Sequence, residues 1–291
     1  MGFPDKWLRW IRECISTPTF SILLNGSPTG FFYNNRGIRQ GDPLSPYLFV
    51  IVMEFWSICT EMSLTSGRYA PIRRNSYNFI THLLFADDKL VFSRANKSAL
   101  TEIKNMLEKF GHYTGLTVNQ NKSTIFFSKS CLNQEELRSI IGFVEGSFPS
   151  KYLGLPLSPT YLKPRHFSSL IDKCRGKLES WSMHTLSFTG RMELIKTVIH
   201  GTISYWIHSF QFPKTVCTEI DRMCAKFLWK GKLHTWKWDS LRRPKSEAGL
   251  GLRKAYDINK AAQLKRFWNY CASNSKWASW LREHYSKGKS I

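Results

Sequence analysis

Acidic residues are scarce in this sequence. It has 21 Asp and Glu residues against 42 Lys and Arg residues, for a formal net charge of +21 at pH 7. A field of this sign attracts polyanions, so the composition favours nucleic acid as a partner, followed by an anionic membrane surface. A basic surface with no activity would give the same totals, so charge alone does not separate these possibilities.

The sequence also lacks the cysteine pairs of a zinc site. No CxxC or CxxH spacing occurs, and the number of cysteines is odd. We therefore expect no structural zinc and predict reduced thiols in an intracellular compartment, either nucleus or cytoplasm. The cysteines are Cys14, Cys59, Cys131, Cys174, Cys217, Cys224 and Cys271.

Long hydrophobic runs are missing as well. The most apolar stretch, Tyr47–Trp56, is far shorter than the ~20 residues of a membrane-spanning helix and contains Glu54. The N-terminus has no signal-peptide core, so we expect a protein that is neither secreted nor bound to a membrane. The 291 residues, 42% of them hydrophobic, are enough for about two folded domains. No internal repeat or low-complexity tract occurs.

An acidic pair stands between two apolar runs. Leu83–Phe85 and Leu90–Phe92 flank Asp87 and Asp88, a pattern that predicts a β-hairpin with its turn at Asp87-Asp88. Adjacent carboxylates raise each other's proton affinity unless a cation neutralises them. Mg²⁺ binds through one or two carboxylates plus substrate phosphates, so the pair suits a metal–nucleotide site. An exposed acidic turn without a ligand is the alternative.

Residues 36–46 combine basic side chains, two glycines and a helix start. Ser45 followed by Pro46 predicts an N-cap, and the apolar helix from Tyr47 to about Met62 is expected to be buried on most faces. Arg36 and Arg39 therefore lie on a glycine-hinged loop that leads to a helix N-terminus, a place suited to phosphates. An ordinary loop and cap is the alternative.

Helical patterns dominate the rest of the chain. Beyond Pro159 the composition shifts, which places a domain boundary near residue 158. Lysines and arginines alternate there with tryptophans, as on a surface that tracks a nucleic-acid backbone, but amphipathic helices with tryptophan in their core would look the same. We expect helices over residues 5–15 (core-facing), 97–113, 133–141, 167–181, 191–210 (with Thr189 as N-cap) and 214–229, a hairpin or two strands within residues 18–34, and short strands at 124–127 and 151–157.

Four blocks occur in one order: RGIRQGDPLSP, FADD, GLTVNQNKS and KYLGLPL. In this order and rough spacing the chain resembles the palm of the LINE-type (non-LTR) retroelement reverse transcriptases of plants. The later segments SFTGRMELIKTVI and FLWKG resemble the thumb of the same family. The resemblance implies an α+β fold. Residues 1–157 would form a partial palm with a small antiparallel sheet, and residues 158–291 a mainly helical thumb and C-terminal extension.

The resemblance also implies a chemistry. Two Mg²⁺ ions would drive attack of a primer 3′-hydroxyl on a dNTP over an RNA template, so the partners are RNA template, DNA primer or RNA–DNA hybrid and dNTP. Asp87 would be the metal ligand and Asp88 its neighbour at the primer end. Nucleotide-binding residues would be Gln40, Gly41, Phe85 and Lys122. Primer or template contacts would come from Arg36, Arg39, Tyr152, Leu153, Gly154, Lys173, Arg175, Lys177 and Arg191.

One part of the family pattern is absent. The motif A aspartate lies on a strand that would precede Pro4, and this sequence begins after it; Asp5 and Asp42 have local roles at a helix start and a loop turn. We therefore expect an N-terminally truncated fragment that is not a competent polymerase by itself, with one edge of the palm sheet unpaired. A non-catalytic, basic nucleic-acid-binding remnant is the alternative.

Overall fold

A computed structural model describes most of the chain as an α+β protein with short sheets. It divides into two compact units, Met1–Glu145 and Gly146–Ile291. This division lies before the predicted boundary after residue 157, and that boundary stays a prediction. The described residues are 1–33, 37–73, 79–182, 186–230, 238–241, 243, 245–247 and 249–282.

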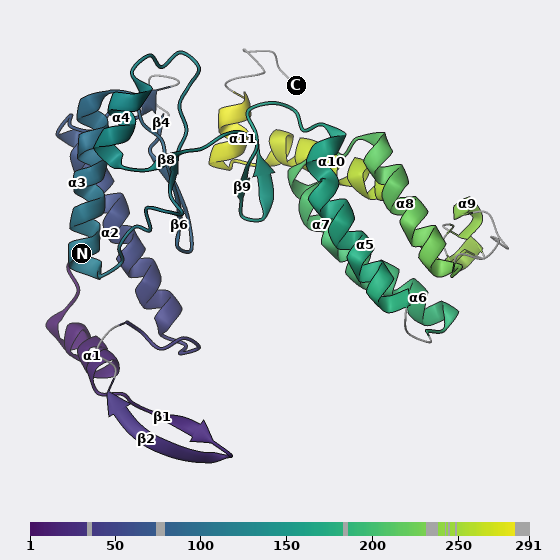
Figure 1. The fold of residues 1–291 in the computed structure, drawn as a ribbon, viewed down its shortest axis with the longest axis horizontal. Helices are drawn as coiled ribbons and strands as arrows, with labels where there is room; N and C mark the ends of the chain where they lie inside the picture. Colours follow the sequence, from purple (N-terminus) through teal and green to yellow (C-terminus); the bar gives the residue numbers. More distant parts are fainter. Residues whose placement is uncertain are drawn as a thin grey trace. The chain divides into compact units, whose positions relative to one another are not determined.

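Unit 1 is built on two packed helices, α2 and α3, with α4 against α3 (Figure 1). Trp56 of α2 and Met106 and Phe110 of α3 form its buried centre. Asn96 caps α3, because its side chain accepts a hydrogen bond from the Ala99 N–H, and Gly115 ends the helix with a φ of 72°. The elements are α1 (Asp5–Ser16), β1 (Thr19–Leu24), β2 (Ser27–Tyr33), α2 (Ser45–Thr65), β3 (Ile72–Arg73), β4 (Phe79–Ile80), β5 (His82–Phe85), β6 (Asp88–Val91), α3 (Lys97–Thr114), β7 (Thr124–Ile125), α4 (Gln134–Ile141) and β8 (Val144–Glu145).

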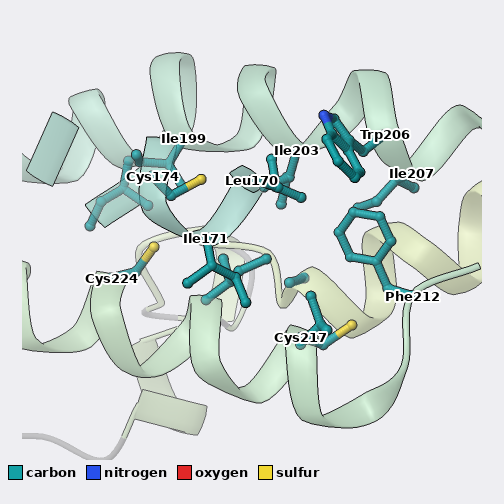
Figure 2. Packing of buried hydrophobic residues seen from close by; sticks show 14 of the residues in the cluster. Leu170, Ile171, Cys174, Ile199, Ile203, Trp206, Ile207, Phe212, Cys217 and Cys224 are labelled. Atoms are coloured by element: carbon teal, nitrogen blue, oxygen red, sulfur yellow. The ribbon is translucent and has the colours of Figure 1, made fainter. Parts of the chain in front are cut away.

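Unit 2 is a helical body preceded by a small hairpin. Figure 2 shows its core, in which Ile171 and Cys174 of α5 meet Ile203 and Ile207 of α7 and Cys217 of α8. Its elements are β9 (Ser150–Tyr152), β10 (Leu155–Leu157), the 3₁₀ turn η1 (Pro164–Phe167), α5 (Ser168–Ser182), α6 (Phe188–Leu194), the π-helical turn η2 (Ile195–Ile199), α7 (His200–Ser209), α8 (Lys214–Leu228), α9 (Trp238–Leu241), the 3₁₀ turn η3 (Lys245–Glu247), α10 (Ala255–Ala272) and α11 (Lys276–Leu281).

In the described part of the chain, the sheets are five separate strand pairs. Four pairs are antiparallel, and β7 pairs with β8 in parallel. In the hairpin β1–β2, Asn25 and Gly26 both have positive φ, as an Asn-Gly hairpin turn requires. Within the described residues, no third strand pairs with β5 or β6, so both edges of this hairpin are unpaired, and the link to a missing strand stays a prediction.

Burial in unit 1 is lower than the sequence predicts. The prediction that the first helix faces a core is wrong, because none of the residues of α1 is buried. The prediction that the helix after the loop is buried on most faces is also wrong: Tyr47 and Val50 of α2 are 70% and 65% exposed. Both helices are apolar on faces that no described element covers, and apolarity alone cannot tell a covered face from an open one.

Helix α2 also passes a length and composition test for crossing a membrane. It has 21 residues, with a mean hydropathy of 1.4 in its most apolar window, and is the one such helix in the described part of the chain. The apolar run Tyr47–Trp56 covers only part of α2, so the sequence run alone gave too short an estimate of this apolar helix. In unit 1 one face of α2 packs against α3, and the expectation of no membrane contact stays a prediction.

Two predicted N-caps are displaced. Leu44, not Ser45, precedes the first residue of α2, and the Ser45 hydroxyl donates instead to the Arg39 carbonyl at 2.7 Å. Ser187, not Thr189, caps α6 by accepting from the Gly190 N–H. Helix α2 thus starts without a side-chain cap, whereas α6 is capped by the hydroxyl two residues before the predicted one.

Candidate active site and nucleic-acid interface

The acidic pair lies at the tip of the hairpin β5–β6. Phe85 pairs with Asp88, which leaves Ala86 and Asp87 as a two-residue turn. The predicted turn at Asp87-Asp88 is therefore wrong by one residue. Tight hairpin turns need a positive φ at their first central residue, and Ala86 supplies it with a φ of 49°. Asp87 is thus in the turn, Asp88 begins β6, and both are exposed.

The hairpin has an inner and an outer face, because paired residues lie on the same side of a strand pair. His82 and Val91 pair on the inner face, as do Leu84 and Lys89, and Leu84 and Val91 pack on the unit 1 core. Asp88 lies on the outer face, where its partner Phe85 is 60% exposed. The outer face therefore presents a carboxylate beside uncovered apolar side chains.

Lys89 anchors the hairpin to the core, a role that sequence reasoning missed. Its Nζ atom lies 3.4 Å from the ring centroid of Phe110 and 4.5 Å from that of Trp56. Burial lowers the pKa of this amine to about 8. The strand alternation could have revealed it, since a residue one position after Asp88 must point to the opposite, inner face.

Polar contacts hold the base of the hairpin. The Tyr69 hydroxyl contacts the carbonyls of Thr81 and Phe92, one beside each strand. His82 lies between Thr81 Oγ1 at 2.9 Å and Ser57 Oγ at 3.3 Å. Burial lowers the pKa of His82 and raises that of Tyr69, so both side chains are neutral near pH 7. The strand ends are thus fixed while the acidic tip stays open.

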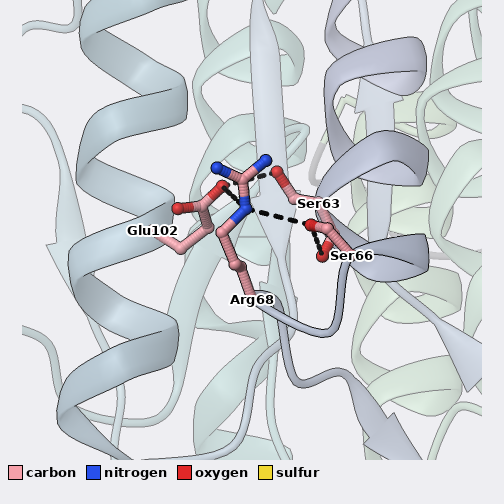
Figure 3. A network of polar contacts seen from close by, with 4 residues as sticks. All are labelled: Ser63, Ser66, Arg68 and Glu102. Carbon is pink, nitrogen blue, oxygen red and sulfur yellow. Dashed lines mark hydrogen bonds and ion pairs between the residues drawn. The ribbon is translucent and has the colours of Figure 1, made fainter.

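A second polar group joins the C-terminal end of α2 to α3 (Figure 3). The buried carboxylate of Glu102 accepts a hydrogen bond from Ser63 Oγ at 2.6 Å, and Arg68 Nε lies 3.7 Å from the same oxygen. Arg68 Nε also donates to Ser66 Oγ at 2.9 Å. These contacts fix the two helices against which Lys89 packs.

The loop before α2 is exposed and shaped by its glycines. Gly37 and Gly41 have φ of 80° and 89°, values that disfavour any other residue. Arg39 and Gln40 are exposed on this loop. Asp42 accepts from the Leu44 N–H at 2.7 Å, which is the local role expected for it. Arg36 lies outside the described residues.

The remaining predicted nucleotide and primer-grip residues lie on other turns. Lys122 is exposed in unit 1, on a turn held by Asn119. Tyr152 ends β9 in unit 2, and Leu153 and Gly154 form the turn to β10 with φ of 49° and 77°. The structure thus brings Phe85, Asp87 and Asp88 together on one hairpin, and the other assignments stay predictions.

Four of the basic residues assigned to primer or template lie in unit 2, and three of these four are engaged within that unit. Arg175 bridges Asp172 and Glu219, Lys177 donates to Thr202 Oγ1, and Arg191 donates to the carbonyls of Leu228 and Leu186. Lys173 is exposed. Their contact with nucleic acid stays a prediction.

Three tryptophans of unit 2 lie in or against its core. Trp206 is buried in the unit 2 core, and Trp181 and Trp229 are partly buried against it. Trp236 lies outside the described residues. These three rings therefore serve the fold, whereas Trp268 and Trp277 of the same unit are 70% and 49% exposed, so a base-stacking surface stays a prediction.

The donor set of the acidic tip suits a Mg²⁺ ion in part. Two adjacent exposed carboxylates offer the hard oxygen ligands that Mg²⁺ prefers, and leave room for water and phosphate. Across the described ranges, no group of three or more His, Cys, Asp or Glu side chains gathers. The pair thus fits part of a Mg²⁺ site, and a second ion needs carboxylates from elsewhere.

Comparison with known proteins agrees with this geometry. The chain is 26% identical over 235 residues to a Retrovirus-related Pol polyprotein from type-1 retrotransposable element R2 of Popillia japonica, covering 77% of this chain and 37% of that protein. It is 22% identical to the Transposon TX1 uncharacterized 149 kDa protein of Xenopus laevis, covering 100% of this chain and 22% of that protein. It is 48% identical over 68 residues to an uncharacterized mitochondrial protein of Arabidopsis thaliana, covering 23% of this chain and 56% of that protein.

The chain spans only part of these relatives, from 22% to 56% of their lengths. A sequence model described as "Reverse transcriptase (RNA-dependent DNA polymerase)" matches residues 1–157, more than half of the 291 residues. That range contains the hairpin with Asp87 and Asp88, the glycine-shaped loop and the turn at Leu153-Gly154. The chain therefore belongs to the reverse transcriptase (RNA-dependent DNA polymerase) family.

Proposed function

We propose that this chain is the palm (1–157) and thumb (158–291) of a plant LINE-type reverse transcriptase, acting inside the cell on an RNA template and a DNA primer. The observation that carries the proposal is the exposed Asp87 in the two-residue turn of β5–β6, inside the family-matched range. The similarity to a retrotransposable element and to an Arabidopsis protein supports the finer assignment. The free thiols, three of them buried, are compatible with a reducing compartment.

The hairpin suits the chemistry of nucleotide addition. A bound Mg²⁺ would supply the Lewis acid that stabilises the charge developing on the transferred phosphate. Asp87 would hold the ion from the turn, and Asp88 would face the primer end from the outer face. Phe85, paired with Asp88 and uncovered, offers an apolar surface for the terminal primer nucleotide. Lys89 and Tyr69 hold the strands so that the carboxylates keep their positions.

We further propose that the 291-residue chain extends primers poorly by itself. A two-metal site needs a carboxylate opposite Asp87, and the described residues offer no third ligand beside the pair. Arg39, Gln40, Gly41 and Lys122 would contact the template and the incoming nucleotide. In a longer polypeptide such as those of the relatives, another segment would supply the missing ligand.

A second candidate function is nucleic-acid binding without catalysis. The net charge of +21 favours it, together with the incomplete ligand set. Binding that neutralises ~6 phosphates of a duplex would weaken with salt at a log–log slope of about −5. Both functions predict this binding, and primer extension separates them.

The test is primer extension on an RNA template with Mg²⁺. Two proteins are compared: the 291-residue chain, and a fusion to the segment that precedes the aligned region in the Popillia japonica polyprotein. We expect incorporation by the fusion and little by the chain alone, and loss of incorporation in Asp87→Asn. Asp257→Asn is the matched control, because Asp257 is an exposed aspartate in the first turn of α10.

Three other results of this test would lead to different conclusions. Incorporation by the chain alone that Asp87→Asn abolishes would support the polymerase and overturn the impairment. Hybrid binding without extension by the folded fusion would favour the non-catalytic function. Absence of hybrid binding by the 291-residue chain at low salt would overturn both.

A further inference from the structure

Unit 2 contains a small basic pocket that none of the predicted contacts uses. It has a volume of about 340 Å³ and lies between α7 and the loop before α10. Lys196, His200 and Ser204 line it at four-residue spacing, so they share one side of the continuous helical segment η2–α7. Gly251 and Arg253 line it from the loop.

The backbone around the pocket is specialised. Lys196 lies in the π-helical turn Ile195–Ile199, an irregularity that occurs often at functional sites. Gly251 has a φ of 63°, and its N–H donates to the Arg243 carbonyl at 3.0 Å. Lys196 Nζ donates to the Leu250 carbonyl at 2.8 Å and ties the helix to the loop. The loop that carries Arg253 is thus held in place.

The lining of this pocket is cationic. It contains Lys196, His200 and Arg253 and no carboxylate. Within the described part of the chain, Arg253 has no hydrogen-bond or ion-pair partner, and the His200 ring has no hydrogen-bond partner. Both side chains therefore keep hydrogen-bond donors that a ligand in the pocket can use. An anion in the pocket would satisfy both side chains.

The pKa of His200 reflects the positive charge of the pocket. Burial, Arg253 and Lys196 together lower the pKa of His200 to about 4. Lys196 on the same helical segment and Arg253 on the loop are the charged groups that face it. A bound anion would offset their positive charge and raise the pKa. Another pocket of unit 2, lined by Lys214, Arg222, Lys226 and Lys254, differs in containing a carboxylate, that of Asp221, which accepts a hydrogen bond from the Ala255 N–H.

We propose that the pocket of Lys196, His200, Ser204 and Arg253 binds one phosphate of a nucleic-acid backbone. The planar guanidinium of Arg253 matches the geometry of a phosphate, and Lys196 supplies a second positive charge. The assignment to nucleic acid rests on the proposed function, whereas the phosphate site rests on the pocket itself. It would add a fixed contact to the strand held by the thumb.

The first test uses inorganic phosphate, which below about pH 6 carries one negative charge, as a backbone phosphodiester does. NMR follows the His200 ring proton in the full chain from pH 3.5 to 7, with His200→Asn for its assignment. We expect phosphate, compared with chloride at equal ionic strength, to raise the pKa of His200. Arg253→Gln should reduce this shift. Lys260→Gln, which removes an exposed charge from α10 outside the pocket, should leave it unchanged.

The second test measures RNA–DNA hybrid binding against salt concentration. Loss of one phosphate contact should make the log–log slope shallower by about one unit in Arg253→Gln and not in Lys260→Gln. No phosphate effect on His200 would overturn the pocket while leaving the proposed function intact. A phosphate effect with an unchanged hybrid slope in Arg253→Gln would overturn the nucleic-acid assignment. Failure of the wild-type chain to bind hybrid would overturn the proposed function and that assignment together.

Discussion

The Nζ atom of Lys89 lies 3.4 Å from the ring centroid of Phe110, so the residue that follows the acidic pair points into the core of unit 1. The carboxylate of Asp88 faces the other way, beside Phe85. One strand therefore anchors the hairpin on its inner face and exposes an acidic group on its outer face. The position of Asp87 in the turn depends on this anchor.

Lys89 makes the stability of the hairpin depend on pH. Burial lowers the pKa of Lys89 from 10.5 to about 8, so between these values the unfolded state binds more protons than the folded state. The free energy of opening should therefore rise as the pH increases from about 8 to 10.5. The two rings favour the charged amine and so oppose this shift.

Lys89→Met, which keeps the length of the side chain, should abolish this rise. Hydrogen exchange of a peptide covering residues 82–92 measures the opening free energy of the hairpin in both proteins. Parallel pH profiles for the wild type and Lys89→Met would show that the amine is not buried as described.

Ala86→Gly should stabilise the hairpin by about 1 kcal/mol. Ala86 has a φ of 49°, and a left-handed backbone costs an alanine ~1–2 kcal/mol that glycine does not pay. Ala261→Gly is the matched control. It removes the same methyl group from the exposed interior of α10 and should destabilise by ~1 kcal/mol. Urea unfolding followed by hydrogen exchange gives both values, and a loss of stability in Ala86→Gly would contradict the turn geometry.

The polar group between α2 and α3 should depend mainly on Ser63. Its hydroxyl donates to the buried carboxylate of Glu102, and a hydrogen bond to a charged group contributes ~1.5–3 kcal/mol. Arg68 is 58% exposed and 3.7 Å from the same carboxylate, so its contribution should stay below ~1 kcal/mol. Urea unfolding of Ser63→Ala and Arg68→Met measures the loss of stability in each variant. A larger loss in Arg68→Met than in Ser63→Ala would contradict this prediction.

The local signals in the sequence explain which elements could be predicted. The hairpin turn at Asn25-Gly26 and the end of α3 at Gly115 follow from residues that adopt positive φ readily. Ala86 and Leu153 also have positive φ, but neither residue type signals it, so the turn beside Asp87 was placed one residue too late. In these two turns the strand pairing, and not the propensity of the residue, sets the conformation.

The sequence predicted the acidic pair of the site but not the residues around it. Asp87 and Asp88 stand out because charge interrupts two apolar runs. The role of Lys89 was not predicted, because a lysine next to an acidic pair resembles a solvated residue. Only the alternation of side chains along the strand indicates that it points to the inner face. The pocket of Lys196, His200 and Arg253 joins residues more than fifty positions apart, and only the packing of α7 against α10 brings them together.

Phe85→Ala should separate binding from stability. The Phe85 side chain is 60% exposed on the outer face, so its loss should change the free energy of unfolding by less than ~0.5 kcal/mol. If this ring packs on the terminal primer nucleotide, its loss should weaken binding of a primer–template by ~1–3 kcal/mol, the range for stacking of a base on an aromatic side chain. Fluorescence anisotropy with a labelled RNA–DNA primer–template measures the affinity.

Tyr113→Ala is the matched control for Phe85→Ala. Tyr113 is an aromatic residue of the same unit, 73% exposed on α3 and away from the acidic tip in sequence. Its substitution should leave the affinity unchanged. Equal losses of affinity in the two variants would mean that any exposed ring of unit 1 contributes, and an unchanged affinity in Phe85→Ala would remove the outer face of the hairpin from the primer site.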